Sequence, residues 1–184
     1  MHKFSPEKAA GLENSERRAL IPPDRTLVRF GLKEGMVLAD IGAGTGFFSR
    51  AGAAIVGPSG RVYAAEMSEQ MVAYFRSQGV PPNVELKHSD EYETHVPDAV
   101  ADLTLLAFVA HENVDKQRLL NEAFRITKPG GAVAIVEWKK QDEPKGPPKE
   151  ERLAQEDLLK ELQGRRVTEQ GDLNRSHYFV LIRR

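Results

Sequence analysis

Cysteine is absent from the 184 residues of the chain. Disulfide bonds, thiolate zinc sites and cysteine nucleophiles are therefore excluded, and we expect no metal site. An excess of charge of one sign is also missing, because 26 Lys and Arg residues face 27 Asp and Glu residues. Proteins that bind nucleic acid usually carry a basic excess, so we expect no nucleic-acid partner.

Long apolar runs are missing as well. The most apolar stretch, residues 103–110, is far shorter than the about 20 residues that a membrane-spanning helix needs. The N-terminal sequence MHKFSPEKAAG lacks the apolar centre of a signal peptide. We therefore expect a cytoplasmic protein without a membrane partner. Its length and its 40% content of hydrophobic residues suit one domain with a single core.

Strand and helix signals alternate through most of the chain. The apolar segments of strand length are 37–41, 61–66, 84–88, 101–110 and 132–138. Helix signals separate them, at 45–56, after the capping residue Ser68, and from Asp115 to the turn at 129–131. This alternation predicts a Rossmann-like, doubly wound, mostly parallel α/β sheet with three α/β/α layers and segment 101–110 at its centre.

The C-terminal part predicts two further strands. Segments 166–169 and 177–182, joined by a turn at Gly171 and Asp172, would form an antiparallel hairpin that completes a seven-stranded sheet. A charged, proline-containing loop at 139–149 and a leucine-bearing helix from Leu153 to Leu162 would precede the hairpin.

We expect one domain over residues 1–184. Its predicted parts are an N-terminal helical cap (1–35), a cofactor-binding core (36–140) and a substrate-side loop, helix and last strands (141–184).

The strongest local signal is DIGAGTG, residues 40–46, between a predicted strand and a predicted helix. Glycines let the backbone turn sharply and approach a ligand that a β-carbon would exclude. The helix N-terminus that follows offers free N–H groups, and ligands of open α/β sheets bind at the carboxyl ends of strands. A glycine turn that only connects two elements is the alternative, and for a lone loop the two are about equally supported.

Two acids at the ends of the next strands favour the ligand site. Glu66 ends the second strand, where a carboxylate can accept both hydroxyls of a ribose. Asp90 follows the third strand, within reach of an adenine amino group. Each acid alone is typical of a solvated surface, whereas the three features together predict a nucleoside pocket.

These motifs resemble the class I S-adenosylmethionine-dependent methyltransferases, in which an acid precedes Gly-x-Gly-x-Gly. The resemblance continues through LAFVAHE (106–112) and RITKPGGAVAIVEW (125–138), and is nearest to the small ubiquinone/menaquinone-methyltransferase-like group. The nicotinamide fingerprint is Gly-x-Gly-x-x-Gly instead, and Gly46 comes one position too early for it.

The resemblance implies the cofactor S-adenosyl-L-methionine and residues that bind it: Asp40, Gly42, Ala43, Gly44, Glu66, Met67, Asp90, Glu91 and Ala107. The glycine loop with its acid would hold the methionine end. Glu66 would bind the ribose, and Met67, Asp90 and the Glu91 amide would contact the adenine. Ala107 and Phe108 would lie near the sulfonium.

The acceptor side is less defined. His111 could act as a general base, because histidine titrates near neutrality, but a structural role at the start of a helix is favoured somewhat. Trp138 could stack on a planar acceptor and Lys139 could attract an anionic one; equally, the tryptophan could cap the core while the lysine is solvated. The loop 139–149 is a lid or a solvated connector.

We therefore expect methyl transfer to a small-molecule acceptor, by an enzyme that could be a homodimer. Departures from the family narrow the chemistry: arsenite methylation of the familiar kind needs cysteines, and no Asn/Asp-Pro-Pro-Tyr/Phe motif follows the fourth strand. The alternatives are a non-catalytic module that binds the cofactor or a partner and, less favoured, a nicotinamide-dependent oxidoreductase. No tyrosine has the Tyr-x-x-x-Lys lysine of many such oxidoreductases.

Overall fold

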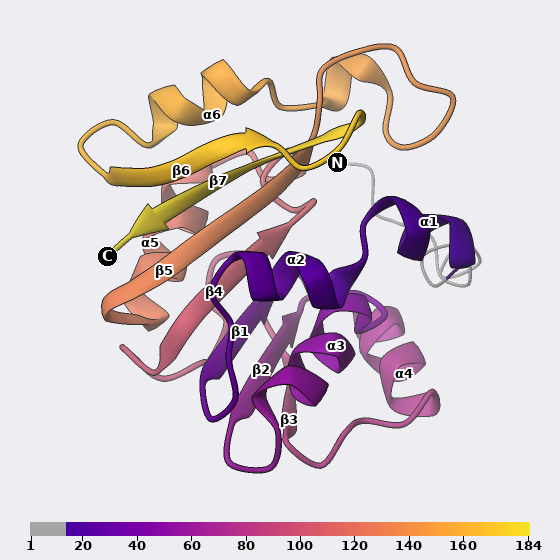
Figure 1. The fold of residues 1–184 in the computed structure, drawn as a ribbon, viewed down its shortest axis with the longest axis vertical. Coiled ribbons are helices and arrows are strands. Elements are labelled where there is room, and N and C mark those ends of the chain that lie inside the picture. Colours follow the sequence, from indigo (N-terminus) through magenta and orange to yellow (C-terminus); the bar gives the residue numbers. More distant parts are fainter. Residues whose placement is uncertain (1–13) are drawn as a thin grey trace.

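A mixed sheet runs through the computed structural model, which describes residues 14–184 (Figure 1). In chain order its strands are β1 (Val37–Ile41), β2 (Arg61–Glu66), β3 (Val84–His88), β4 (Ala101–Ala107), β5 (Thr127–Trp138), β6 (Arg166–Asp172) and β7 (His177–Arg183). They lie side by side in the order β3-β2-β1-β4-β5-β7-β6. The strands from β3 to β5 are parallel, and β7 is antiparallel to both of its neighbours. The predicted seven-stranded sheet, its central strand and its edge hairpin are confirmed.

Helices cover both faces of the sheet. They are α1 (Ser15–Leu20), α2 (Pro23–Arg29), α3 (Phe47–Val56), α4 (Glu69–Ser77), α5 (Lys116–Ile126), the short 3-10 helix η2 (Lys149–Glu151) and α6 (Gln155–Glu161). Side chains of α2, α3 and α4 pack into one apolar cluster, together with Leu103 and Phe179 of the sheet. Side chains of α5 and α6 pack into a second cluster on the other face, with Leu106 and Val180. Two apolar layers therefore enclose the sheet, as the three-layer fold requires.

Capping side chains begin two of the helices where the sequence predicts them. The Ser68 hydroxyl accepts the Met71 N–H at 3.3 Å at the start of α4. The Asp115 carboxylate accepts the Arg118 N–H at 3.0 Å at the start of α5. Each side chain satisfies one of the backbone donors that a helix N-terminus leaves unpaired, so these starts are fixed locally.

The central strands differ from the prediction at their ends. β4 stops at Ala107 rather than at residue 110, because Phe108 takes a left-handed φ of 63° that interrupts the strand. β5 begins at Thr127 rather than at residue 132, because Thr127 pairs with Ala101 across an irregular register. The predicted turn around Gly130 therefore lies within the extended segment.

The predicted turn at Gly171 and Asp172 is wrong. Both residues belong to β6, where they pair with Phe179 and Tyr178 of β7. The connection lies at 173–176 instead, and the Asn174 side chain closes it by accepting two backbone N–H groups. A side-chain turn of this kind leaves no glycine signal in the sequence.

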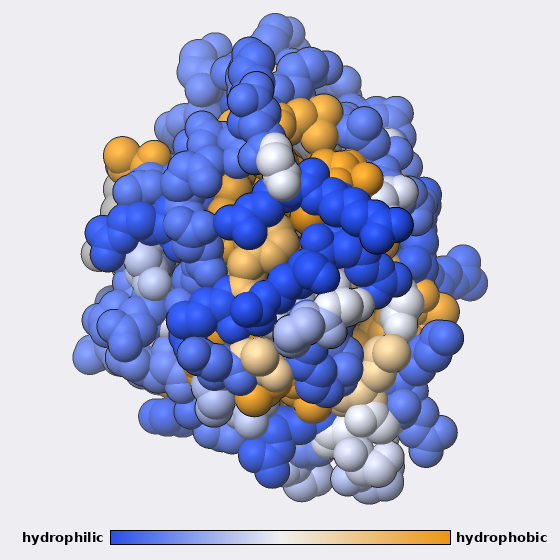
Figure 2. Space-filling view, turned by 90° about the vertical axis from the view of Figure 1, so that its left-hand side faces the viewer, coloured by the Kyte–Doolittle hydropathy of each residue, from blue (hydrophilic) through white to orange (hydrophobic). Residues whose placement is uncertain are grey.

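The N-terminal part of the described chain is helical, since α1 and α2 lie there. The first thirteen residues of the predicted helical cap (1–35) lie outside the described residues. Between residues 14 and 184, no helix is long and apolar enough to cross a membrane. Figure 2 views the side of the molecule opposite to α1, and this face is mostly hydrophilic with small, interrupted apolar areas.

Candidate cofactor and acceptor site

The glycine loop connects the carboxyl end of β1 to the start of α3. Gly42, Gly44 and Gly46 have φ values of 72°, 55° and 88°, all in the left-handed region. The Gly42 and Ala43 N–H groups donate to the Ala65 carbonyl at 2.8 and 3.0 Å, which ties the loop to β2. The loop thus lies at the strand edge where open α/β sheets bind their ligands.

The three glycines are required for different reasons. A β-carbon on Gly42 would lie 2.4 Å from Val109 Cγ2, and one on Gly46 would lie 2.4 Å from Phe75 Cζ. Both glycines are therefore needed for packing within the protein. A β-carbon on Gly44 would meet nothing closer than the Gly42 carbonyl oxygen at 4.0 Å among the described residues. Gly44 is the glycine that faces open space, where a ligand can approach the backbone.

Asp40 is a buried acid directly below this loop. Its Oδ2 accepts a hydrogen bond from the Ser49 hydroxyl of α3 at 2.6 Å. Burial raises the pKa of Asp40 to about 6, and the negative charge of Glu66 adds to the rise, while the bond from Ser49 opposes it. A buried carboxyl group with a perturbed pKa beside a ligand loop is typical of a functional site and suits a cationic ligand group.

Glu66 is a second buried acid and binds the loop itself. Its Oε2 accepts the Gly44 N–H at 2.8 Å, and its Oε1 accepts the Ser68 N–H at 2.8 Å. Each carboxylate oxygen has a further lone pair, so the group can still accept hydrogen bonds from a ligand. Met67, the next residue, has 40% of its surface exposed and is therefore accessible to a ligand. The structure thus brings Asp40, Gly44 and Glu66 together.

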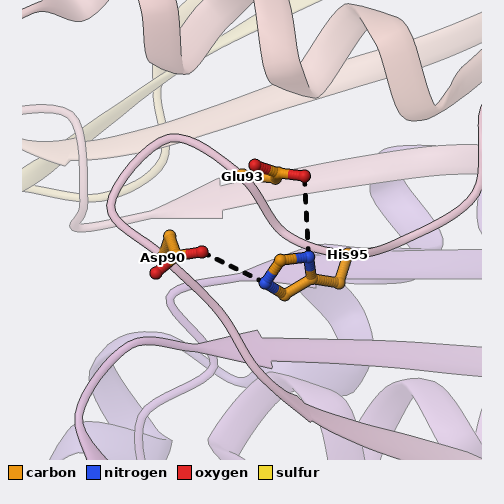
Figure 3. Close-up of side chains that lie close together, drawn as sticks. All are labelled: Asp90, Glu93 and His95. Carbon is orange, nitrogen blue, oxygen red and sulfur yellow. Dashed lines mark ion pairs between the residues drawn. The ribbon is translucent and has the colours of Figure 1, made fainter.

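Asp90 lies in the loop after β3, where its side chain faces His95 (Figure 3). Its carboxylate lies 3.2 Å from His95 Nε2, and His95 Nδ1 lies 3.7 Å from Glu93. All three side chains are exposed, as is Glu91. Their ligand atoms lie within 4.8 Å of one another, but exposed acids commonly gather without a metal ion. The histidine is a partner of Asp90 that the sequence did not indicate.

Three aromatic rings gather where β4 and β5 end, and we call them the aromatic cluster: Phe108, Trp138 and His177. The Trp138 and His177 ring centroids lie 4.2 Å apart, and Phe108 lies 5.8 Å from Trp138 and 5.1 Å from His177. Arg17 of α1 lies 5.5 Å from the Phe108 ring. Phe108 belongs to this cluster and also has a left-handed φ of 63°. Residues with backbone strain of this kind are concentrated at functional sites.

His111 is held by a carboxylate that sequence analysis missed. Glu137 of β5 is fully buried, and its two oxygens accept the His111 backbone N–H at 3.0 Å and bind Nδ1 at 2.8 Å. Burial alone would lower the pKa of His111, but the hydrogen bond and the charge of Glu137 outweigh it and raise the pKa. In the sequence, Glu137 could have been noticed as the single acid near the end of the otherwise apolar segment AVAIVEW.

His111 and Trp138 lie at the ends of neighbouring strands but on different faces of the sheet. Successive side chains of a strand point to opposite faces, so Glu137 and Trp138 diverge. His111 follows Glu137, whereas Trp138 lies against Phe108 and His177. The two side chains therefore lie on opposite sides of β5, and their roles toward an acceptor stay predictions.

The loop 139–149 folds around the buried Arg152. The Arg152 guanidinium donates to backbone carbonyls of this loop, those of Lys139, Gln141, Lys145 and Pro147. It also lies 5.0 Å from the Trp138 ring, and a β-carbon on Gly146 would come within 2.9 Å of that ring. The loop thus packs on one member of the aromatic cluster, and its role as a lid stays a prediction.

An open cavity of about 610 Å³ lies elsewhere, lined by residues of the loop after β3 and of α5: Tyr92, Glu93, His95, Val96, Pro97, Arg118, Glu122 and Arg125. None of the glycine-loop residues lines it. We place the candidate site at the glycine loop instead, because the buried acids Asp40 and Glu66 and the open Gly44 converge there, and burial raises the pKa of Asp40.

Known methyltransferases resemble this chain in sequence and fold. A family model described as a methyltransferase domain matches residues 39–135. A SAM-dependent methyltransferase from Aquifex aeolicus is 35% identical, with 98% of both chains covered and a TM-score of 0.91. A putative type 11 methyltransferase from Sulfolobus solfataricus shares the fold at 23% identity, with 94% and 93% of the chains covered and a TM-score of 0.71.

A ubiquinone/menaquinone biosynthesis C-methyltransferase from Hydrogenovibrio crunogenus is 32% identical over 118 residues, which cover 62% of this chain and 46% of the relative. The chain thus spans about half the length of the curated relatives that it matches.

Proposed function

Because the chain belongs to the family of S-adenosylmethionine-dependent methyltransferases, we propose that it methylates a small, planar molecule that enters at the aromatic cluster. When bound, S-adenosylmethionine supplies an electrophilic methyl group, which passes in line to the acceptor's nucleophile as the bond to sulfur breaks. Alignment of the two reactants accounts for much of such a rate enhancement. The single observation that carries the proposal is the open Gly44, held between the buried acids Asp40 and Glu66.

The residues beside Gly44 fit the cofactor. Asp40 would bind the ammonium group of the methionine end, and the backbone of Gly42, Ala43 and Gly44 would lie against it. Glu66 already accepts two backbone N–H groups and has lone pairs left for ribose hydroxyls.

The adenine would lie toward Met67, Asp90 and Glu91. The exposed Met67 supports this placement, since it offers an apolar surface next to Glu66. Binding there would compete with the contact between Asp90 and His95. Ala107 would then lie beside the sulfonium at the end of β4.

The acceptor would enter between the cofactor and the aromatic cluster. Phe108 and Trp138 are half-buried and present rings of different orientation, with Arg17 nearby. Rings of this kind favour a conjugated acceptor over a flexible apolar one. The names of the curated relatives refer to ubiquinone and menaquinone biosynthesis, and hydroquinone-like rings, the reduced form of such quinones, are therefore the first acceptors to test.

For His111 the geometry favours a structural role over proton transfer. One carboxylate, Glu137, binds both its backbone N–H and its ring, which fixes the segment after β4. The ring is also on the other face of β5 from Trp138. We propose residues 36–140 as the cofactor-binding core and 141–184 as the substrate side, since Arg152 and His177 lie in the latter part.

The test measures release of S-adenosylhomocysteine by the purified chain with a panel of small conjugated acceptors. Product in excess of enzyme supports catalysis, whereas cofactor binding without turnover favours a non-catalytic module. Gly44→Val should abolish cofactor binding. Gly164→Val is the matched control, because Gly164 also has a left-handed φ, 81°, and no neighbour within 4 Å among the described residues, but lies after α6. Equal loss in both variants would count against the glycine-loop site.

A further inference from the structure

His177, at the start of β7, carries a buried nitrogen without a partner. The side chain is 2% exposed, and its Nε2 has no hydrogen-bond partner among the described residues. Buried polar atoms are satisfied in the great majority of cases, and an exception needs an explanation. Neither its place in the sequence nor the proposed cofactor site accounts for this atom.

The hydrogen bonds of Asn174 fix which nitrogen of His177 carries the proton. Asn174 Oδ1 accepts the backbone N–H groups of Ser176 and His177, both at 2.9 Å, so this atom is the oxygen of the amide. Asn174 Nδ2 donates to the Leu20 carbonyl at 2.9 Å, in agreement with that assignment. His177 Nδ1 lies 3.0 Å from Oδ1 and must therefore donate to it. In a neutral ring, Nε2 is then the nitrogen with the lone pair.

The surroundings keep the ring neutral. Burial lowers the pKa of His177 to about 4, and the positive charges of Arg17, Arg152 and Lys139 add to this, while Glu143 opposes it. At neutral pH the Nε2 lone pair therefore persists as a hydrogen-bond acceptor. The imidazole lies beside Phe108 and Trp138, whose rings are half-buried.

We propose that His177 Nε2 binds the methyl acceptor, by accepting a hydrogen bond from an O–H or N–H group on its ring. The proposal rests on the proposed function and adds a specificity-determining residue to it. The acceptor's ring would lie against Trp138 and Phe108, and its donor group would reach the imidazole. This bond would fix the orientation of the acceptor relative to the end of β4.

The bond also predicts what the site rejects. An ether oxygen or a deprotonated oxygen in the same place has no hydrogen to donate. It would face the lone pair of His177 Nε2, so that two hydrogen-bond acceptors would oppose each other. Sites built to bind a hydroxyl or N–H group discriminate strongly against analogues that lack it. An acceptor that enters with its donor group intact is therefore favoured over its own methyl ether.

The experiment uses the full chain saturated with S-adenosylhomocysteine, and phenol and methoxybenzene as probes. Calorimetry measures their affinity for the wild type, His177→Phe and His177→Gln. Phenylalanine keeps the ring contacts but has no acceptor; glutamine can donate to Asn174 and place its oxygen near the former Nε2. Phenol should bind the wild type about two- to tenfold more tightly than His177→Phe, as expected for one neutral hydrogen bond. His177→Gln should recover part of the loss, and methoxybenzene should not distinguish the variants.

A second readout follows the imidazole itself. In nitrogen-15 spectra of histidine-labelled protein, phenol should move the His177 Nε2 resonance and methoxybenzene should not. Equal affinities of phenol for all three proteins, or an Nε2 resonance that phenol leaves unmoved, would overturn the proposal and leave a packing role for the ring. Failure of S-adenosylhomocysteine to bind would instead contradict the proposed function, so the two failures are distinguishable.

Discussion

Glu66→Gln is the substitution whose effect the structure defines most closely. The carboxylate accepts two backbone N–H groups, from Gly44 and Ser68, both at 2.8 Å, and is buried. Glutamine has the same shape, but its single oxygen can serve only one of the two donors. Its NH₂ group would then face the other N–H, so one buried donor loses its partner.

The magnitude follows from that mismatch. A buried unpaired donor costs about 1–3 kcal/mol, and a hydrogen bond to a charged group contributes about 1.5–3 kcal/mol. These figures describe overlapping losses, so they are not added. The negative charge of Glu66 helps to raise the pKa of Asp40, so its loss also removes a repulsion between the two carboxylates. We therefore expect a loss of about 2 kcal/mol, which lowers the melting temperature of a chain of this size by about 4–8 °C.

The assay combines thermal unfolding of the ligand-free chain with calorimetric titration of S-adenosylmethionine. Affinity should fall at least about tenfold, because the ribose loses a charged acceptor and the Gly44 loop loses its anchor. Glu34→Gln is the control, since Glu34 is exposed and outside the site. A melting temperature within about 1 °C of the wild type, together with unchanged affinity, would refute this account of Glu66.

Three further predictions concern the loop, the cofactor and pH. Gly46→Ala should destabilise the fold more than Gly44→Ala in urea unfolding, because its β-carbon would lie 2.4 Å from the Phe75 ring; equal effects would contradict this. The pKa of His177 is depressed from 6.5 to about 4, so its contribution to stability is complete above pH 6.5 and is lost as pH falls toward 4. Unfolding free energies between pH 7 and 4 should fall less steeply in His177→Phe, and identical slopes would count against the shift. S-adenosylmethionine affinity should weaken as pH falls through about 6, where Asp40 takes up a proton, and Asp40→Asn should remove this dependence; a flat wild-type profile by calorimetry would exclude it.

Local signals in the sequence determined most of the fold and half of the candidate site. β1, β2 and β3 have the predicted bounds, because short apolar runs between turn signals leave few alternatives. Ser68 and Asp115 cap the helices that they were predicted to begin, because a cap needs only a neighbouring backbone N–H. The glycine loop could be read in the same way, since its function requires residues that are adjacent in the chain.

Only the tertiary structure decided what each of those glycines does and which groups surround His111 and Trp138. Gly42 and Gly46 are required by Val109 and Phe75, which come from distant parts of the chain. Glu137 binds His111 across 26 positions, and Asn174 sets the tautomer of His177 beside Trp138. Burial and hydrogen bonding of this kind depend on the order of strands in the sheet. A single sequence records the residues but not their neighbours, and it is the neighbours that decide a protonation state or an unpaired lone pair.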